Sequence, residues 1–430
     1  MTSNLRLKYY SCWTTDDSRI ALSNTISRFS PMFRLARRTL PLGKRGFCSA
    51  ESGTTPKRGP LDGTVVLELE GLAAAPFCGM FLADFGADVL RIDKKGQERH
   101  FATSTLGRGK RSVELDLKDA GDAARFRELA ATADVLIEPY RPGVMERLSL
   151  GPEELCAANP RLVYARLTGW GQTGPQAHTA GHDINYIAQS GALSLFARPG
   201  ERPLPPVNLL GDFAGGSMSC AAGILLALLE RGASGRGQVV DAAMIDGAAY
   251  LSTFVHKLAG CGMWDGRAGA AGSNLLDTGA HFYDTYEARC GGFVAVGAIE
   301  PQFYALLLRG LGLAGDPLFA GGTRRQLDPS SWGPCRAAMA EVFLTRSRDE
   351  WSARFRTAEL EDACVSPVLG MAEVGVDAHG AQRGLMAGVA GGEEGEREPA
   401  PAPRLSRTPA LGPRPCPRSG EHTEEVLGQR

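Results

Sequence analysis

The stretch TGWGQTG, residues 168–174, directly follows an apolar run and carries the spacing G-x-G-x-x-G of a phosphate-binding turn. A dinucleotide turn of this kind opens a helix and has an acidic residue about 20 positions further on, which holds a ribose. Here Pro175 follows the last glycine, and residues 193–196 carry no acid. The motif therefore does not indicate a nicotinamide site. A glycine-rich turn after a parallel strand instead predicts the floor of a different ligand site.

Histidine and aspartate residues lie close behind this turn. His178 and His182 are four positions apart, as in a helical zinc pair, but the flanking proline and glycine argue against a helix and no third ligand is near. We therefore expect no metal site. His182 with Asp183 also fits a helix N-cap, and Asp212 before FAGG fits a cap of the following helix. Taken singly, these residues leave a capping role open beside a catalytic one.

The composition is that of an ordinary globular protein, with 43% hydrophobic and 22% charged residues in a chain of 430. This length predicts two domains of unequal size. Residues 1–59 hold eleven Lys and Arg against three Asp and Glu. Because the formal net charge of the whole chain is -1, the rest of the chain is acidic. An acidic body argues against a nucleic-acid partner. The ten cysteines include no C-x-x-C pair, which indicates reduced thiols in an intracellular compartment.

The first 59 residues are typical of a targeting segment. Seven basic residues and no acidic one lie between Arg19 and Arg45. In MFRLARRTL the arginines and the apolar residues fall on opposite sides of a helix, as in a mitochondrial transit peptide. A disordered basic tail is the alternative, and Met32 is a possible second start.

From Leu61 onward, short apolar runs alternate with helical stretches. Length and β-branched content predict strands at residues 65–69, 88–93, 112–117, 134–140 and 161–167. Helices are expected between several of them, at residues 76–86 and 119–133. This alternation predicts an α/β domain with a large parallel sheet, Rossmann-like in kind. The apolar stretch 213–229 is too short to span a membrane and is expected to be a buried helix packed on the sheet.

The second half of the chain has a different pattern. Residues 281–299 predict a hairpin that turns at Cys290-Gly291-Gly292, and helices are expected around residues 301–313 and 349–357. A smaller α+β domain follows from this order of elements, and the proline-rich stretch 391–417 is expected to be extended. We therefore predict four segments along the chain, at residues 1–59, 60–255, 256–398 and 399–430, the last of which returns to the large domain.

Five motifs occur together in an order that is typical of one enzyme family. They are LADFGADVLRID (82–93), LGRGKRSVELDLK (106–118), GHDINY (181–186), LLGDFAGG (209–216) and AVGAIEPQFY (295–304). With them the chain resembles the family III CoA-transferases from about residue 59 to residue 427, and most of all the racemases among them. The resemblance implies an interlocked homodimer, with each active site between the large domain of one subunit and the small domain of the other.

The resemblance assigns His182 and Asp212 as two acid/base groups, with Glu300 assisting. Inverting the carbon next to a thioester requires that a proton leaves one face and another arrives on the opposite face, so two groups with different pKa values are needed. Partial burial would raise the pKa of Asp212, and Glu300 would orient the imidazole by hypothesis. Backbone amides near residues 183–185 would stabilise the enolate oxygen. No cofactor is required, because coenzyme A is part of the substrate.

The resemblance also implies contacts to coenzyme A. They fall on Lys94, Leu115, Asp116, Leu117, Lys118, Arg141, Gly181, Asp183, Ile184, Asn185 and Tyr186. Lys94 stands where the racemases generally carry arginine, which replaces a bidentate phosphate contact by a single point charge. In the turn before PFC, Ala74-Ala75 stands in place of the Pro-Gly that the racemases usually carry.

The expected activity is racemisation or epimerisation of 2-methyl-branched acyl-CoA thioesters, with branched fatty acids and bile-acid side chains as candidate acyl groups. The alternative is a CoA-transferase in which Asp212 is the nucleophile of a covalent intermediate. A catalytically silent CoA-binding subunit is the third option. From the transit-like residues 1–59 we expect a mitochondrial location. The peroxisome, as in the family, is the alternative, although EEVLGQR at the end of the sequence lacks the peroxisomal tripeptide of animal racemases.

Overall fold

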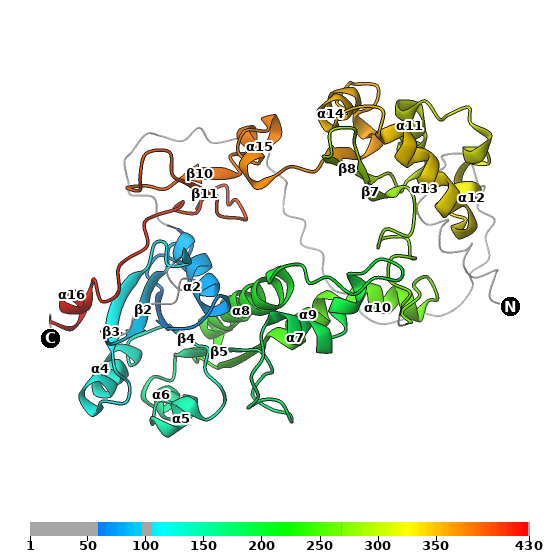
Figure 1. The fold of residues 1–430 in the computed structure, drawn as a ribbon. Helices are drawn as coiled ribbons and strands as arrows, with labels where there is room; N and C mark the ends of the chain where they lie inside the picture. The colour runs from blue at the N-terminus through cyan, green and yellow to red at the C-terminus, as the bar shows by residue number, and fades with distance from the viewer. Residues whose placement is uncertain (1–58, 97–104, 268, 429–430) are drawn as a thin grey trace, which may run out of the picture. The chain divides into compact units, whose positions relative to one another are not determined.

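A computed structural model describes residues 59–96, 105–267 and 269–428. The predicted transit peptide lies outside these described residues. A parallel sheet of six strands forms the centre of the α/β part of the chain (Figure 1). Its strands are β1 (Val65–Leu69), β2 (Asp88–Lys94), β3 (Arg111–Leu115), β4 (Val135–Glu138), β5 (Val163–Thr168) and β6 (Val239–Ala243).

The strand order is β3-β2-β1-β4-β5-β6, and every neighbouring pair is parallel. The chain first adds strands outward from β1 on one side and then, from β4 on, outward on the other side. In open α/β sheets a crevice forms at the carboxyl ends of the strands where the order reverses, which here is between β1 and β4. The topology therefore marks a ligand site before any side chain is considered.

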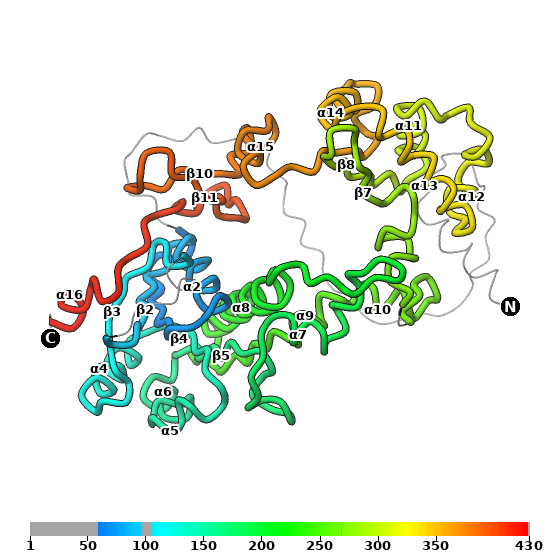
Figure 2. The backbone as a smooth tube through the Cα atoms, in the orientation of Figure 1, coloured from blue at the N-terminus to red at the C-terminus, as the bar shows by residue number. Residues whose placement is uncertain are grey.

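Helices cover both faces of this sheet, because side chains of successive strand residues point to opposite sides. Val66 belongs to the core under α2 (Ala74–Asp84) and α8 (Ser219–Ser234). Leu67 belongs to the core on the other face, under α4 (Ala120–Ala130), α5 (Val144–Arg147) and α6 (Pro152–Ala158). Figure 2 follows the backbone through these layers in the same view.

The apolar stretch predicted at 213–229 is part of a longer helical run, Leu209–Ser234. By length and composition alone, this run is long and apolar enough to cross a membrane. One side of it packs on the sheet through Cys220, Ala221 and Ile224. The expected packing on the sheet is therefore present, but the other side exposes Leu225, Leu226 and Leu229, so the helix is buried on one side only. The run covers the sheet with one face only, because no described segment packs over the other.

The smaller α+β region has an antiparallel sheet of the order β7-β8-β9. The predicted hairpin is present, and helices pack against it around an aromatic core that includes Phe282, Trp332 and Trp351. Its elements are β7 (Tyr283–Glu287), β8 (Phe293–Gly297), β9 (Val365–Pro367), α11 (Pro301–Leu311), α12 (Gly322–Gln326), α13 (Pro329–Phe343) and α14 (Arg348–Phe355).

The other described elements are short. A third sheet, of two antiparallel strands, pairs β10 (Met386–Gly388) with β11 (Arg397–Pro399). The remaining α-helices are α7 (Asp183–Gln189), α9 (Met244–Leu251), α10 (Thr253–Gly260), α15 (Ala378–Arg383) and α16 (Thr423–Leu427). Single turns or irregular helices lie at η2 (Ala192–Leu195), η3 (Leu209–Met218), η4 (Pro317–Phe319), η5 (Glu361–Ala363) and η6 (Met371–Glu373).

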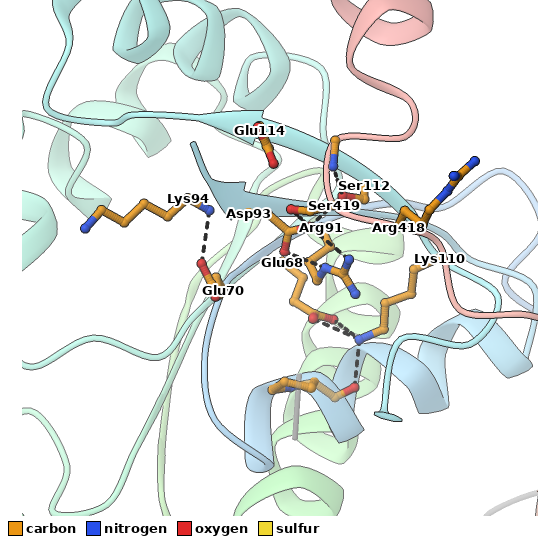
Figure 3. A network of polar contacts seen from close by, with 12 residues as sticks. Glu68, Glu70, Arg91, Asp93, Lys94, Lys110, Ser112, Glu114, Arg418 and Ser419 are labelled. Carbon is orange, nitrogen blue, oxygen red and sulfur yellow. Dashed lines mark hydrogen bonds and ion pairs between the residues drawn. The ribbon is translucent and has the colours of Figure 1, made fainter. Parts of the chain in front are cut away.

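The C-terminal segment covers the outer edge of β3. The amide of Ser112 donates to Nδ1 of His422 at 3.3 Å, and the amide of Glu114 donates to Oγ1 of Thr423 at 3.1 Å. The amide of His422 in turn donates to the carbonyl of Ser112. Ser419 joins the same place through a hydrogen bond to Asp93 (Figure 3). An edge strand that would otherwise present unpaired amides is thereby capped.

The fold class predicted from the sequence is confirmed, namely a parallel α/β sheet with a smaller α+β region. The five predicted strands and both predicted helices are present within a few residues of their expected bounds. Strand β6 was not predicted, because three of its five residues are at least partly exposed and one of these is an aspartate. The irregular helix η3 that holds Asp212 was not predicted either.

Candidate active site

A cavity of about 560 Å³ opens at the carboxyl ends of β1, β4 and β5, where the strand order reverses. The turns after these strands form one side of it, and the first turn of α2 forms another. His182 and Asp212 both line this cavity. Its further walls include Leu72, Ala74, Ala75, Tyr140, Arg141, Gly169, Trp170, Gly181, Tyr186 and Met244.

His182 is the N-cap residue of α7. Its amide donates to Oδ1 of Asn185 at 3.0 Å, and its carbonyl accepts from the amide of Asn185 at 2.8 Å. These two bonds fix the main chain at the helix start while the imidazole stays exposed at the cavity wall. The capping alternative and the catalytic alternative are therefore compatible, because the main chain of His182 caps the helix.

Asp212 lies inside η3, a π-helix of ten residues, and does not cap a helix. π-helical turns are rare and occur frequently at functional sites. Burial raises the pKa of the Asp212 carboxyl, and the charge of Asp183 adds to this, while a hydrogen bond from Nδ2 of Asn208 at 3.0 Å and the nearby His182 act in the opposite direction. The predicted rise of this pKa through partial burial agrees with the structure.

Asp183 connects the two candidate acid/base groups. It follows His182 in the chain, and its Oδ1 accepts hydrogen bonds from the amides of Gly211 at 2.6 Å and Asp212 at 2.8 Å. The residue is buried, so its carboxylate is turned toward η3. Asp183 therefore sets the place of Asp212 relative to the helix that begins at His182.

The glycine-rich turn after β5 shapes the cavity floor, as the sequence predicted. A Cβ atom on Gly169 would lie 2.0 Å from the ring of Tyr186, and one on Gly181 would lie 2.7 Å from it. The Tyr186 ring also meets Trp170 edge-on, with 4.8 Å between centroids. Gly169 of this turn and Gly181 further along the chain thus make room for an aromatic wall, and the turn does not open a helix.

A buried ion pair is hydrogen-bonded to the first turn of α2. Nζ of Lys110 lies 2.6 Å from Oε2 of Glu68 and donates to the carbonyl of Pro76 at 2.8 Å (Figure 3). Both charged side chains are fully buried, and this burial raises the pKa of Glu68 and lowers that of Lys110. Ala73, just before the helix, has a φ of 37°, a region that costs energy for any residue with a Cβ. The main chain directly before α2 is therefore strained.

A second cavity, of about 240 Å³, lies at the carboxyl ends of β2 and β3. Five residues that the resemblance assigns to coenzyme A line it, namely Lys94, Leu115, Asp116, Leu117 and Lys118. Tyr140 lines both cavities. The turn that carries Tyr140 is fixed by Glu138, whose Oε1 accepts from the Tyr140 amide at 2.6 Å and whose Oε2 accepts from Nε of Arg166 at 2.9 Å. The two cavities are thus neighbours on one edge of the sheet.

The remaining predicted residues are placed as follows. Arg141, Gly181 and Tyr186 line the larger cavity, whereas Ile184 and Asn185 lie in α7 outside its lining. Glu300 is the N-cap of α11 in the smaller α+β region and is not among the residues that line the larger cavity. Among the residues that the structure describes, no group of three His, Cys, Asp or Glu is arranged to hold a metal ion.

Comparison with known proteins decides the family. A model of CoA-transferase family III matches residues 61–423. The chain belongs to the family III CoA-transferases.

Similar proteins of this family include both racemases and transferases. The chain is 49% identical to human alpha-methylacyl-CoA racemase over 368 residues, which covers 85% of this chain and 92% of the relative. It is 31% identical to the beta subunit of succinyl-CoA–L-malate CoA-transferase from Chloroflexus aurantiacus, covering 86% and 93%. The family and the enzyme class predicted from the motifs are confirmed.

Solved structures of the family share the fold. A CaiB/BaiF family protein from Brucella suis matches with a TM-score of 0.72 at 25% identity, covering 86% of this chain and 99% of the other. A Mycobacterium tuberculosis protein matches with a TM-score of 0.70 at 26% identity, covering 87% and 100%.

Proposed function

We propose that this enzyme is a racemase that inverts the α-carbon of 2-methyl-branched acyl-CoA thioesters. The observation that carries the proposal is the pairing of His182 and Asp212 in one cavity at the switch point of the sheet. The 49% identity to alpha-methylacyl-CoA racemase supports the choice of reaction. Branched fatty acids and bile-acid side chains are the acyl groups we propose to test.

The proposed reaction is a transfer of protons on two faces of one carbon. The neutral imidazole of His182 removes the α-proton from one face, and protonated Asp212 delivers a proton to the other. The raised pKa of Asp212 favours its protonated form and so suits it to this delivery. In the reverse direction the two groups exchange roles. The thioester activates the α-proton, so the proposed chemistry needs no further cofactor.

Negative charge on the thioester oxygen builds up between the two proton transfers. We propose that main-chain amides near residues 183–185, which directly follow the cavity-lining His182, stabilise this charge. We also propose that coenzyme A occupies the smaller cavity, where Lys94 and Lys118 supply positive charge for its phosphates. Tyr140 would then lie beside the pantetheine arm as it passes from one cavity to the other.

We further propose a homodimer in which Glu300 of a second copy completes each site. Within one chain, Glu300 is not part of the cavity that holds His182. Large apolar side chains are exposed on three successive helices, at Leu226 and Leu229 of α8, Tyr250 of α9 and Phe254 of α10. Exposed apolar area of this kind is typical of a subunit interface.

Co-expression of His182→Ala and Glu300→Ala chains tests the shared site. If each site takes one residue from each chain, a mixed dimer retains one intact site, and a statistical mixture shows about a quarter of the wild-type activity. If both residues come from the same chain, the mixture stays inactive. For the location of the protein we propose the mitochondrion, which microscopy of the tagged full chain would test.

The racemase proposal itself is tested by exchange of the α-proton. The full chain is incubated in deuterium oxide with one enantiomer of a 2-methylacyl-CoA, and the product is analysed by mass spectrometry and chiral chromatography. We expect deuterium at the α-carbon and both enantiomers in the product. The His182→Ala and Asp212→Ala variants should form no second enantiomer, and each should exchange the α-proton only through its remaining base. No exchange, together with CoA transfer to an added carboxylic acid through an adduct on Asp212, would instead establish a transferase.

A further inference from the structure

The main chain of Asp212 is held by side chains at both of its peptide groups. Its amide donates to Oδ1 of Asp183 at 2.8 Å, and its carbonyl accepts from Oγ of Ser217 at 2.8 Å. Ser217 is fully buried and lies five residues after Asp212, which is the repeat of a π-helix. The Ser217 hydroxyl therefore supports the wide turn from which the carboxyl of Asp212 projects.

Ser217 also reaches beyond its own helix. Its Oγ lies 2.7 Å from the carbonyl of Ala74, in the first turn of α2, and Ala74 lines the cavity. One hydroxyl has a single proton, so it is shared between the carbonyls of Ala74 and Asp212. This hydroxyl links the helix that carries Asp212 to the first turn of α2, which is another part of the cavity wall.

The contact between η3 and α9 does not perform this task, and the ring of Phe213 reaches α2 only by packing on Phe77, without a hydrogen bond to the main chain of Asp212. The helix meets α9 with almost no side chains between, since a Cβ on Gly215 would lie 2.8 Å from the amide of Ala248, and one on Gly247 would lie 1.9 Å from the carbonyl of Gly215. Such a contact sets how close the two helices lie. It leaves the turn at Asp212 to be fixed by polar bonds.

We propose that Ser217 is a positioning residue for proton transfer, because its hydroxyl holds the Asp212 turn against α2 and so keeps the carboxyl aligned with one face of the α-carbon. This inference rests on the proposed racemase function. Loss of the hydroxyl lets the turn relax and displaces Asp212, while His182, on α7, keeps its place. Ser217 then affects proton transfer on one face of the substrate only.

The matched pair of variants is Ser217→Ala and Ser219→Ala. Ser219 lies in the same helical run and donates to a carbonyl five residues back, that of Ala214, at 3.3 Å. That bond touches neither Asp212 nor α2. The pair therefore separates the loss of any such bond from the loss of the bond that holds Asp212.

The experiment follows deuterium uptake from deuterium oxide, separately for each enantiomer of a 2-methylacyl-CoA, in the wild type and both variants. One enantiomer presents its α-proton to His182, which can exchange that proton alone, with retention of configuration. In Ser217→Ala we expect the rate of deuterium uptake into this enantiomer to stay within twofold of the wild-type rate. Uptake into the other enantiomer and inversion in both directions should fall about tenfold, with KM unchanged. Ser219→Ala should behave as wild type, and thermal unfolding should show that both variants are folded.

Equal slowing of uptake into both enantiomers would overturn the inference, because it would mean that Ser217 supports the whole site without distinguishing the faces. Unchanged rates in Ser217→Ala would overturn it as well. If the wild type takes up no deuterium into either enantiomer, the racemase function itself has failed, and that result is visible without either variant.

Discussion

The carboxylate of Asp183 offers the sharpest test of how the two acid/base groups are held together. It accepts two hydrogen bonds from main-chain amides of η3 and is only 6% exposed. A hydrogen bond to a charged group contributes about 1.5–3 kcal/mol, so Asp183→Ala removes on the order of 3–6 kcal/mol of interaction at this point. Each 1.36 kcal/mol that is lost from the transition state lowers the rate about tenfold. We therefore expect kcat of Asp183→Ala to fall at least about 100-fold.

Asp183→Asn separates geometry from charge. The amide oxygen of asparagine can accept both hydrogen bonds, and its nitrogen takes the place of Oδ2, which has no hydrogen-bond partner among the described residues. The variant removes a negative charge that helps to raise the pKa of Asp212. We expect kcat to stay within about tenfold of wild type. The pKa of Asp212 should fall, so the acid limb of the reaction in which Asp212 is the base moves to lower pH.

The assay is racemisation of each enantiomer of a 2-methylacyl-CoA across the pH range, with kcat and KM measured for the wild type and both variants. Circular dichroism of the folded variants serves as the control. The reasoning is refuted if Asp183→Asn is as inactive as Asp183→Ala, since the hydrogen bonds would then not be what matters. A shift of the acid limb to higher pH would also refute it, because the charge would then act on Asp212 in the opposite direction.

Four further changes test the surroundings of the site and, in the last case, the core of the smaller α+β region. Lys110→Met leaves the buried Glu68 without its partner and should lower the free energy of unfolding by about 3–5 kcal/mol in urea titrations, most of which the double variant with Glu68→Leu should restore. Ala73→Gly relieves a positive φ and should raise the same free energy by about 1 kcal/mol, with activity retained. Lys94→Arg, in the smaller cavity, should lower KM for acyl-CoA about threefold and leave kcat unchanged, which steady-state kinetics would show. Burial lowers the pKa of His281 from 6.5 to about 3, so the folded protein disfavours protonation of this histidine. The free energy of unfolding should therefore fall by about 1.4 kcal/mol per pH unit as the pH falls from 6.5 toward 3. In His281→Gln, unfolding curves measured across this pH range should show a flatter slope.

The parts of the fold that depend on local pattern could be predicted from the sequence. The runs of β-branched residues at 65–69 and 88–93 form strands because they are buried on both faces, and the turn at Cys290 forms because glycines follow it. The order of the strands could not be predicted in this way. It depends on which strand pairs with β1, and pairing joins residues such as Val66 and Val135 that lie far apart in the sequence.

In the candidate site, too, some features could be predicted from local sequence and others depend on contacts between distant residues. His182 and Asp212 could be identified from motifs, and the start of α7 could be placed because His182 is followed by residues with a helical pattern. The π-helix around Asp212 could not be foreseen, because its wide turn depends on bonds from Asp183 and Ser217 that form only in the folded protein. The roles of Tyr140 and Asn208 were missed for the same reason. The position of Tyr140 at the carboxyl end of the predicted strand 134–140 is a signal that pointed to it.

The cap on β3 has a consequence for synthesis of the chain on the ribosome. The hydrogen bond between Ser112 and Gly420 joins residues 308 positions apart. At roughly 5–20 residues per second, about 15–60 seconds pass between the emergence of β3 and the arrival of the segment that covers it. During that time the nascent sheet presents an open edge to other nascent chains and to chaperones. A premature stop that removes only the last dozen residues would make that open edge permanent.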